Sequence, residues 1–420
     1  MVLGFVVSAT WVSAAQAQDT AVNFSGFGTL GVTAQHGAEG WGFQRTTSQP
    51  GAQSKLSASQ DTRVGLQANW NPNPTWEGAL QVVAAQRPVG APASESVEWA
   101  YAGYRPFTET RLRLGRVSPD IFLFADSRNV GFAFPWARPP ADFYGFAPGT
   151  SVDGVDVEQR WSLGDATWRA RFTAGEFGTS VTGNDGERYP LAGRHIVALG
   201  LTRESGGLLL KASYFRGRVR IDTGADAQQL QLALAQLATL PVPGLADSIA
   251  GLQGNLWNGG AISYVALGAQ YETGPWTVIA EGSDLRVPGS PLDGKRAYLS
   301  VGYRHHDVTY YSVVSRVKPD RQAVVAPDVT GSLTPVLGAA GAAGAQQAMN
   351  YAAQAGAVYR FDQSTVGAGL RWDCTPRAAV KLQVDRFDVH ANGAAGWRHG
   401  DAREAHGVLV SVLLDFIWGQ

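Results

Sequence analysis

Cysteine, charge and long apolar runs are all scarce in this sequence of 420 residues. Cys374 stands alone, which excludes an intrachain disulfide and weakly indicates a compartment outside the cytoplasm. Charged residues make up only 16% of the chain, and the net charge of −1 creates no field that would attract nucleic acid. Past the N-terminal region, no stretch reaches the ~18 consecutive apolar residues of a spanning helix, which excludes a helical membrane protein.

Catalytic and metal-binding patterns are also missing from the sequence. The 7 histidines are scattered, with no His-x-His pair on a strand and no carboxylate cluster, so we expect no metal. No nucleophile has a histidine placed to activate it, so we expect no enzyme. The stretch GAAGAAG lacks the Gly-Lys-Ser/Thr of a phosphate-binding loop, and we expect no cofactor.

Residues 1–17 predict a secretory signal peptide. Val2 to Val12 is an apolar run of secretory length, and Ala15-Gln16-Ala17 has the small-x-small form of a cleavage site. The basic residue that usually precedes such a run is missing. Residues 18–420 show no domain boundary, so we expect the mature chain to be a single domain outside the cytoplasm.

Glycine and aromatic residues are abundant. With 51 Gly, 13 Trp, 13 Tyr and 17 Phe, the composition is typical of many short strands and tight turns. The segment TRVGLQANW places Val64, Leu66 and Trp70 on one face of a strand, with Arg63 and Gln67 on the other. The turn NPNP and a second alternating segment follow, so the pair predicts an antiparallel hairpin.

The end of the chain carries the longest apolar face. Every second residue from Val408 to Trp418 is apolar, whereas the opposite register includes Ser411 and Asp415. A soluble sheet could pack that face on a core, and a membrane barrel would turn it toward lipid.

The alternating segments repeat along the whole chain, joined in turn by a short and a long connection. Short turns are expected at residues 71–74, 106–109, 162–165, 204–207, 273–275, 305–307 and 374–377. Long loops are expected near 35–58, 86–94, 118–152, 177–192, 219–258, 285–293, 317–362 and 389–405. These connections join sixteen strands. Uniformly tight turns on one rim are typical of outer-membrane barrels.

Tryptophans gather at the strand ends beside the short turns. The residues concerned are Trp70, Trp76, Trp161, Trp168, Trp276, Trp372 and Trp418. Aromatic girdles mark the membrane interfaces of barrels, although tryptophan also favours β-sheet in general. Charges facing lipid would cost about 2–4 kcal/mol each at the midplane, so the polar strand faces require water within. We therefore predict an all-β fold, a sixteen-stranded antiparallel transmembrane β-barrel with an aqueous lumen.

Two long loops contain segments of biased composition. Residues 225–240 place Leu230, Leu234 and Leu237 at helical spacing, which predicts a short amphipathic helix over part of the barrel mouth. Residues 337–357 are rich in alanine and glycine, and a helix, a mobile segment or a partial strand all remain open for them.

Several segments resemble the sixteen-stranded general porins of Gram-negative outer membranes. VNFSGFGTLGV resembles their first strand, and DTRVGLQANW the second, where an arginine precedes an apolar-Gly pair. LRLGRV and the loop after it resemble the fifth strand and the third loop, and DGVDVEQRW resembles the sixth strand. Trp418 resembles the C-terminal signal read by the barrel-assembly machinery, but Gly419 and Gln420 follow it here. The third loop lacks the usual short acidic motif, which indicates a divergent branch.

The resemblance implies a diffusion channel with short periplasmic turns, long extracellular loops and a third loop, residues 118–152, folded inward against a basic wall. It maps that wall to Arg63, Arg116 and Arg160. Alternation points Arg63 and Arg160 into the lumen but turns Arg116 outward, unless a bulge at Gly115 turns it in. Otherwise, Arg111 and Arg113 are the expected lumen cations.

The third loop would supply the facing charges. Its candidate acids are Asp120, Asp126 and Asp142, and Arg128 and Arg138 lie in the same loop. Opposed charges across a narrow opening would orient polar solutes and filter them by sign and size. The same residues could instead pair with one another and only hold the loop in place.

The expected function is therefore an outer-membrane porin for the passive diffusion of small hydrophilic solutes or ions. Its expected partners are outer-membrane lipid, two further copies in a homotrimer and the barrel-assembly machinery, with no nucleic acid. Two alternatives remain open. One is a solute-specific channel with a binding site on the third loop, and the other is an adhesin or receptor acting through loops 219–258 and 317–362.

A chain with this apolar outer face should need detergent to stay in solution. We expect size-exclusion chromatography to give a monodisperse species in micelles and aggregates once detergent is removed, because the lipid-facing side chains would then contact water. A monodisperse chain in detergent-free buffer would contradict the barrel.

Overall fold

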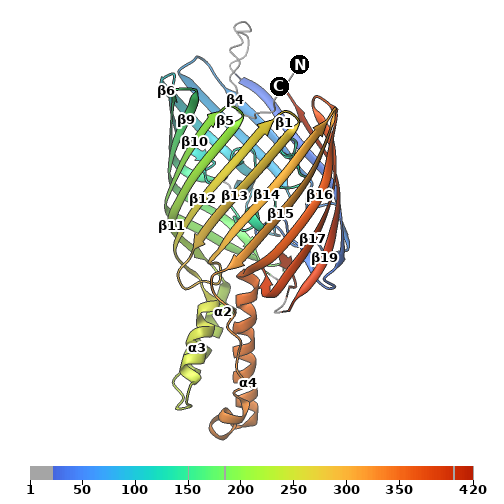
Figure 1. The fold of residues 1–420 in the computed structure, drawn as a ribbon. Coiled ribbons are helices and arrows are strands. Elements are labelled where there is room, and N and C mark those ends of the chain that lie inside the picture. The colour runs from blue at the N-terminus through green and yellow to red at the C-terminus, as the bar shows by residue number, and fades with distance from the viewer. Residues whose placement is uncertain (1–21, 150, 184–185, 401–402, 420) are drawn as a thin grey trace.

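The computed structural model describes residues 22–149, 151–183, 186–400 and 403–419, so the predicted signal peptide lies outside the described residues. A single antiparallel sheet curls into a closed cylinder (Figure 1). Its first long strand, β1 (Val22–Gly37), pairs with β4 (Arg63–Trp70) on one side and with the last strand, β19 (Ala405–Trp418), on the other. The sheet counts 17 strands, of which β3 (Leu56–Ser57) is a two-residue addition beside β1. The other sixteen form the wall, which confirms the predicted fold.

The remaining wall strands each pair with their neighbours in the chain. They are β5 (Trp76–Ala85), β6 (Val97–Phe107), β7 (Thr110–Val117), β8 (Val152–Leu163), β9 (Ala166–Thr182), β10 (Arg188–Ser205), β11 (Leu208–Ile221), β12 (Gly259–Thr273), β13 (Trp276–Arg286), β14 (Gly294–His305), β15 (Val308–Pro319), β16 (Phe361–Thr375) and β17 (Ala378–Ala394). The loops contain β2 (Gly42–Phe43) paired with β18 (Trp397–Arg398), the helix α1 (Ala141–Tyr144), and the 3-10 helices η1 (Ala93–Ser96), η2 (Gly131–Ala133) and η3 (Gly254–Leu256).

Short and long connections alternate between the two rims, as predicted. Every predicted short turn joins two wall strands on the rim where β1 begins and β19 ends (Figure 1). The loop expected at 177–192 is the exception, because β9 and β10 continue their pairing from Glu204–Thr167 up to Arg188–Thr182. The prediction of a long loop there was wrong. A hairpin that rises beyond the bilayer can be polar on both faces, so its composition resembles that of a loop.

Alternate residues of the wall strands face two different surroundings. On β19, Val412 and Leu414 are 50% and 38% exposed, whereas their neighbours Leu413 and Asp415 are 1% and 0% exposed. The exposed apolar side chains continue around the outer surface, for example at Leu66, Leu299 and Val384. The apolar face of the last strand therefore points out of the barrel. Its other face points into the barrel, where it contacts water or protein.

Three helices extend from the long-loop rim and are here called the arm. They are α2 (Gly224–Leu237), α3 (Leu245–Gln253) and α4 (Thr330–Tyr359), and they lead away from the barrel (Figure 1). Leu234, Ile249, Leu252, Leu333 and Met349 are buried between them. Helix formation in residues 225–240 is confirmed, but the helix packs within the arm, because α3 and α4 cover its apolar side. Among the described residues, no helix combines the length and apolar character needed to cross a bilayer.

The two faces of β4 give a matched test of this orientation. Leu66→Arg should lower the free energy of unfolding by about 2–4 kcal/mol, because it places a charge on the lipid face. Gln67→Arg, one residue along on the polar inner face, should cost far less. Urea titration of both variants refolded into lipid vesicles would measure the difference, and equal losses would contradict the assignment of faces.

Candidate functional site

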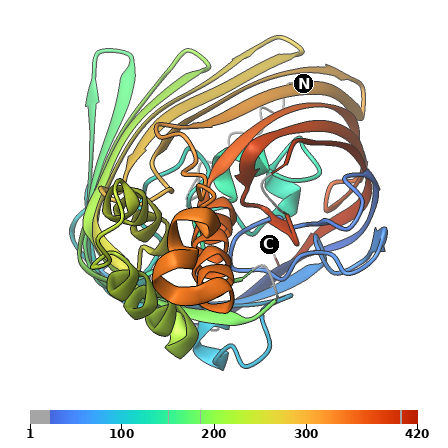
Figure 2. The same ribbon diagram turned by 90° about the horizontal axis from the view of Figure 1, so that it is seen from below.

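The connection between β7 and β8, residues 118–151 and here called loop 3, runs inside the barrel. Figure 2, seen from the arm side, shows this loop within the ring of strands. On β17, the Lys381 ammonium donates to the carbonyls of Gly131 at 2.7 Å and Trp136 at 2.9 Å. The Trp136 indole N–H donates to Ser300 on β14 at 2.8 Å. The loop is thus held by side chains of two wall strands, β14 and β17.

Aromatic residues of loop 3 pack on an apolar part of the inner wall. Phe122, Phe134, Trp136, Phe143 and Tyr144 are buried together with wall residues of β10 to β15, which are Ile196, Ala198, Phe215, Tyr264, Ala266, Ile279, Leu285, Tyr298, Tyr311 and Val313. Burying each such loop side chain contributes about 1.5–3 kcal/mol. The expectation of a polar inner face was therefore wrong for these strands, since the loop, and not water, covers them.

Arg138 is the main polar anchor of loop 3. Its guanidinium forms ion pairs with Asp61 at 2.7 Å and Asp385 at 3.2 Å, and it also donates to Thr33 and Ser411. All of these groups are buried. Burial alone would raise the pKa of the Asp61 carboxyl, but the attraction of Arg138 outweighs it and lowers that pKa to about 2. The anchor therefore stays ionised in the interior.

Wall cations bind backbone carbonyls of the same loop. Arg63 on β4 donates to Asn129 at 2.7 Å, and Arg371 on β16 donates to Phe134 at 2.8 Å. Lys381, described above, also forms an ion pair with Asp415 at 2.8 Å. Arg63 is thus in the lumen, as alternation predicted, and its contact there is with loop 3.

The candidate acids of loop 3 also have wall partners. Asp120 is buried and forms ion pairs with Lys211 and with Arg169 at 3.5 Å. Asp126 pairs with Arg171 at 3.0 Å. Asp142 accepts hydrogen bonds from Ser315 at 2.7 Å and Gln363 at 2.6 Å, and its burial raises the pKa of its carboxyl to about 6. Asp120 and Asp126 thus neutralise wall cations directly.

Solvent reaches a few charges inside the barrel, two of them on β8 and β9 and one on loop 3. The side chains of Arg160 and Asp126 are 39% and 43% exposed, and that of Arg169 is 26% exposed. Arg160 lies 2.8 Å from Glu158, and the register pairs Arg160 with Arg169 across β8 and β9. Since Arg160 and Arg169 point into a closed barrel, the lumen beside β8 and β9 is open to water.

Other cations on this side of the barrel join carboxylates in a network of separate ion-pair clusters. Arg111 and Arg105 share Glu77, and Arg113 and Arg171 share Asp156. The ion pairs of β5 to β9, with Lys211 of β11 and two acids of loop 3, join the cations Arg105, Arg111, Arg113, Arg160, Arg169, Arg171 and Lys211 to the acids Glu77, Asp120, Asp126, Asp156 and Glu158. Cations thus outnumber acids in the network.

Arg116 lies apart from this network. Its guanidinium binds Asp153 on β8 at 2.7 Å and the carbonyl of Ser94 at 2.6 Å. The pairing of β7 with β8 runs without a break from Thr110 to Val117, so the strand has no bulge there that turns Arg116 inward. Arg116 instead occupies the edge of a pocket at the long-loop end of the barrel.

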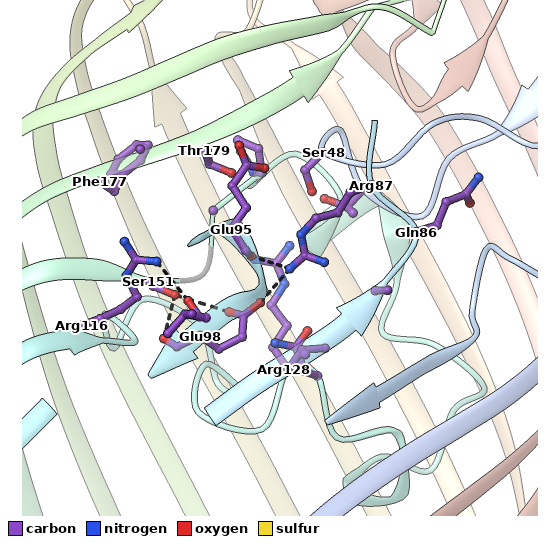
Figure 3. Close-up of a pocket in the computed structure, with 18 of the residues that line it drawn as sticks. Ser48, Gln86, Arg87, Glu95, Glu98, Arg116, Arg128, Ser151, Phe177 and Thr179 are labelled. Carbon is purple, nitrogen blue, oxygen red and sulfur yellow. Dashed lines mark hydrogen bonds and ion pairs between the residues drawn. The ribbon is translucent and has the colours of Figure 1, made fainter. Parts of the chain in front are cut away.

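This pocket has an empty volume of about 830 Å³ and lies between β5 to β9 and three loops (Figure 3). Four of its lining residues are Arg45, Arg87, Arg116 and Arg128, and hydroxyl groups of Ser48, Ser151 and Thr179 also line it. Arg87 lies 3.6 Å from Glu98. Within the described part of the chain, the buried Nε of Arg45 and Nη1 of Arg128 have no hydrogen-bond partner.

The lining also contains Glu95, Glu98 and Asp153, but among the described residues these acids pair with other arginines and leave Arg45 and Arg128 without an ion pair. Arg128 donates to the carbonyls of Tyr144 and Ala147, at 2.9 Å and 2.7 Å, and has no carboxylate partner among the described residues. Burial, together with repulsion from Arg63 and other arginines, lowers the pKa of Arg45 to about 9. A water molecule or a small anion would satisfy the unpaired N–H groups.

Some of the residues that matter were not singled out from the sequence. Arg45 lies in a loop with no periodicity, so nothing indicated its direction. Lys211 could have been found, because it interrupts the apolar segment LLLKASYF at an inward position. Among the residues that the structure describes, no three His, Cys, Asp or Glu side chains gather as metal ligands.

Comparison with known proteins gives structural similarity alone. No protein-family model matches the chain, and no curated protein sequence matches it. OmpT, an outer membrane protein of Vibrio cholerae, is 12% identical, with 96% of this chain and 100% of that one covered and a TM-score of 0.47. The outer membrane channel DcaP of Acinetobacter baumannii is 15% identical, with 94% and 97% covered and a TM-score of 0.48. OmpF of Salmonella typhi, in complex with daunomycin, is 12% identical, with the same coverage and a TM-score of 0.47.

The anchoring role of Arg138 can be measured directly. Arg138→Met should lower the free energy of unfolding by about 3–5 kcal/mol, because Asp61 and Asp385 would remain buried without their cation. Arg321→Met, at an exposed loop arginine, serves as the control. Denaturant unfolding in detergent micelles compares the two, and equal stabilities would show that loop 3 does not depend on this anchor.

Proposed function

We propose that this protein is a porin-like channel of the Gram-negative outer membrane, through which small hydrophilic solutes and ions diffuse passively. The observation that carries the proposal is the exposure of Arg160, Arg169 and Asp126 to solvent inside a closed barrel whose outer face is apolar. Charged side chains that contact water inside a lipid-facing cylinder do not form a packed core. They can line a path for polar solutes.

The path in this proposal begins in the arginine-lined pocket and continues along the inner wall of β5 to β9. Loop 3 narrows it, since the loop occupies the side of β10 to β15. The constriction would combine Arg111, Arg113 and Arg160 of the wall with Asp126 of the loop, while Arg63, Asp120, Arg128 and Asp142 hold the loop in position. Arg116 would act at the pocket, above the constriction.

Selection in this channel would favour anions. Carboxylates along the path are paired with arginine or lysine, and the cations exceed them in number. Arg45 and Arg128 add two guanidinium groups with unpaired N–H atoms at the pocket floor. A focused positive potential raises the local concentration of anions and their rate of entry.

Assembly as a homotrimer and insertion by the barrel-assembly machinery belong to the same proposal. The outward aromatic residues Phe416 and Trp418 near the end of β19 support recognition of the terminal strand. A second candidate function is binding of a partner through the arm, which the separate buried core between α2, α3 and α4 favours.

Planar-bilayer recording tests the channel and its selectivity. The wild-type barrel should give stable conductance, with a reversal potential in a KCl gradient that shows anion preference. Arg45→Gln combined with Arg160→Gln should reduce the anion-to-cation permeability ratio. If each cation lies ~6 Å from the path of the ion in water, its removal should lower the ratio by about threefold.

Lys55→Gln combined with Arg321→Gln is the matched control, since both side chains are exposed on loops. An unchanged ratio in the first variant would contradict the selectivity. A folded barrel with no conductance would contradict the channel and favour binding through the arm.

A further inference from the structure

The outer surface of β10 to β15 changes character near the long-loop rim. Toward the middle of these strands the outward residues are apolar, as at Leu199, Tyr214 and Val265, which lie in one register row. Beyond them, toward the rim, outward positions are occupied by a group here called the basic belt: Arg194, Arg216, Arg218, Arg220, Arg286, Lys295 and Lys318. Every member is exposed.

Strand register brings these cations together. Arg216 is opposite Val197 and Ser263, and Ser263 is opposite Arg286. Arg194 lies directly opposite Arg218, and Lys295 lies between Lys318 on one neighbouring strand and Asp284 on the other. Like charges facing each other across strands destabilise a sheet, so these pairs do not exist for the stability of the barrel alone.

Most cations of the basic belt form no ion pair with the described residues, and Asp284 is the carboxylate that lies among them. Arg286 pairs with Asp284 at 3.0 Å. Within the described residues, Arg194, Arg216, Arg218 and Arg220 form no ion pair or side-chain hydrogen bond. An external anion would relieve the repulsion between these guanidinium groups, which bind phosphate with two parallel hydrogen bonds.

A groove crosses the centre of the belt. Its lining includes His195, Tyr214, Arg216, Arg218 and Arg286. The empty volume is about 1130 Å³. The groove begins among cations and ends beside the apolar row of Tyr214, so its occupant must have a charged end and an apolar end.

We infer that the basic belt binds the phosphate groups of anionic lipid in the leaflet on the long-loop side. The position decides between lipid and other anions, because a soluble anion would not contact the apolar row beside the cations. The opposite rim carries aromatic residues in the corresponding outward positions, such as Trp276, Tyr303 and Trp372, so the two leaflets meet chemically different surfaces. This inference rests on the membrane placement in the proposed function and not on its channel activity.

The test compares lipid retention by two variants with equal loss of charge. Arg216→Gln, Arg218→Gln and Arg286→Gln together remove the centre of the belt. Arg203→Gln, Arg321→Gln and Arg386→Gln remove three arginines elsewhere. Native mass spectrometry from micelles doped with phosphatidic acid should show retained lipid on the wild type and the control, with affinity on the order of a hundredfold lower in the belt variant.

Phosphatidylcholine of the same chain length and inorganic phosphate are the comparison probes. Weak retention of phosphatidylcholine, and no displacement of phosphatidic acid by inorganic phosphate, are expected. Equal retention by both triple variants, or full displacement by inorganic phosphate, would overturn the inference. The inference would also be overturned if the belt variant retained phosphatidic acid normally and lost only the association between copies of the chain.

Bilayer conductance of the same samples separates this inference from the proposed function. A belt variant that conducts normally but no longer retains phosphatidic acid supports the lipid site. A wild type that retains the lipid without conducting would keep the lipid site and contradict the channel.

Discussion

Closure of the sheet between β1 and β19 is the constraint on which the rest of this structure depends. Within hydrocarbon, backbone N–H and C=O groups have no water to bind, so a sheet can cross the bilayer only if it has no edge. The pairing from Gly26–Trp418 to Gly37–Gly407 removes that edge. Once the cylinder is closed, each strand must place alternate residues in oil and in the interior, and the outer apolar surface follows directly.

The interior is divided by loop 3 into a packed half and a wet half. Aromatic residues of the loop cover the apolar inner face of β10 to β15, whereas solvent reaches inward-pointing arginines on β8 and β9. Arg63, Arg371 and Lys381 hold the loop through its backbone carbonyls, and Arg138 holds it through buried carboxylates. The charges around the loop therefore serve two purposes: some hold it in place, and others remain available to solutes.

Charge also separates the two rims of the outer surface. Aromatic side chains surround the rim of short turns, whereas the basic belt, most of whose cations form no ion pair with the described residues, occupies the long-loop rim over β10 to β15. Inside the barrel, the arginine-lined pocket lies at the same long-loop end. A molecule built in this way has a fixed direction in a membrane whose leaflets differ.

The sequence by itself determined the strands, their number, the alternating rims and the direction of side chains such as Arg63, Arg160 and Asp415, because all of these follow from a period of two and from turn chemistry within one strand or hairpin. Only the tertiary structure decided what the inward side chains contact. That Arg63 binds the carbonyl of Asn129, that Asp120 pairs with Lys211, and that Arg45 lies beside Arg128 each depend on the path of a loop with no periodicity. The polar hairpin of β9 and β10 and the packing of the arm were likewise hidden, since both depend on partners distant in the chain.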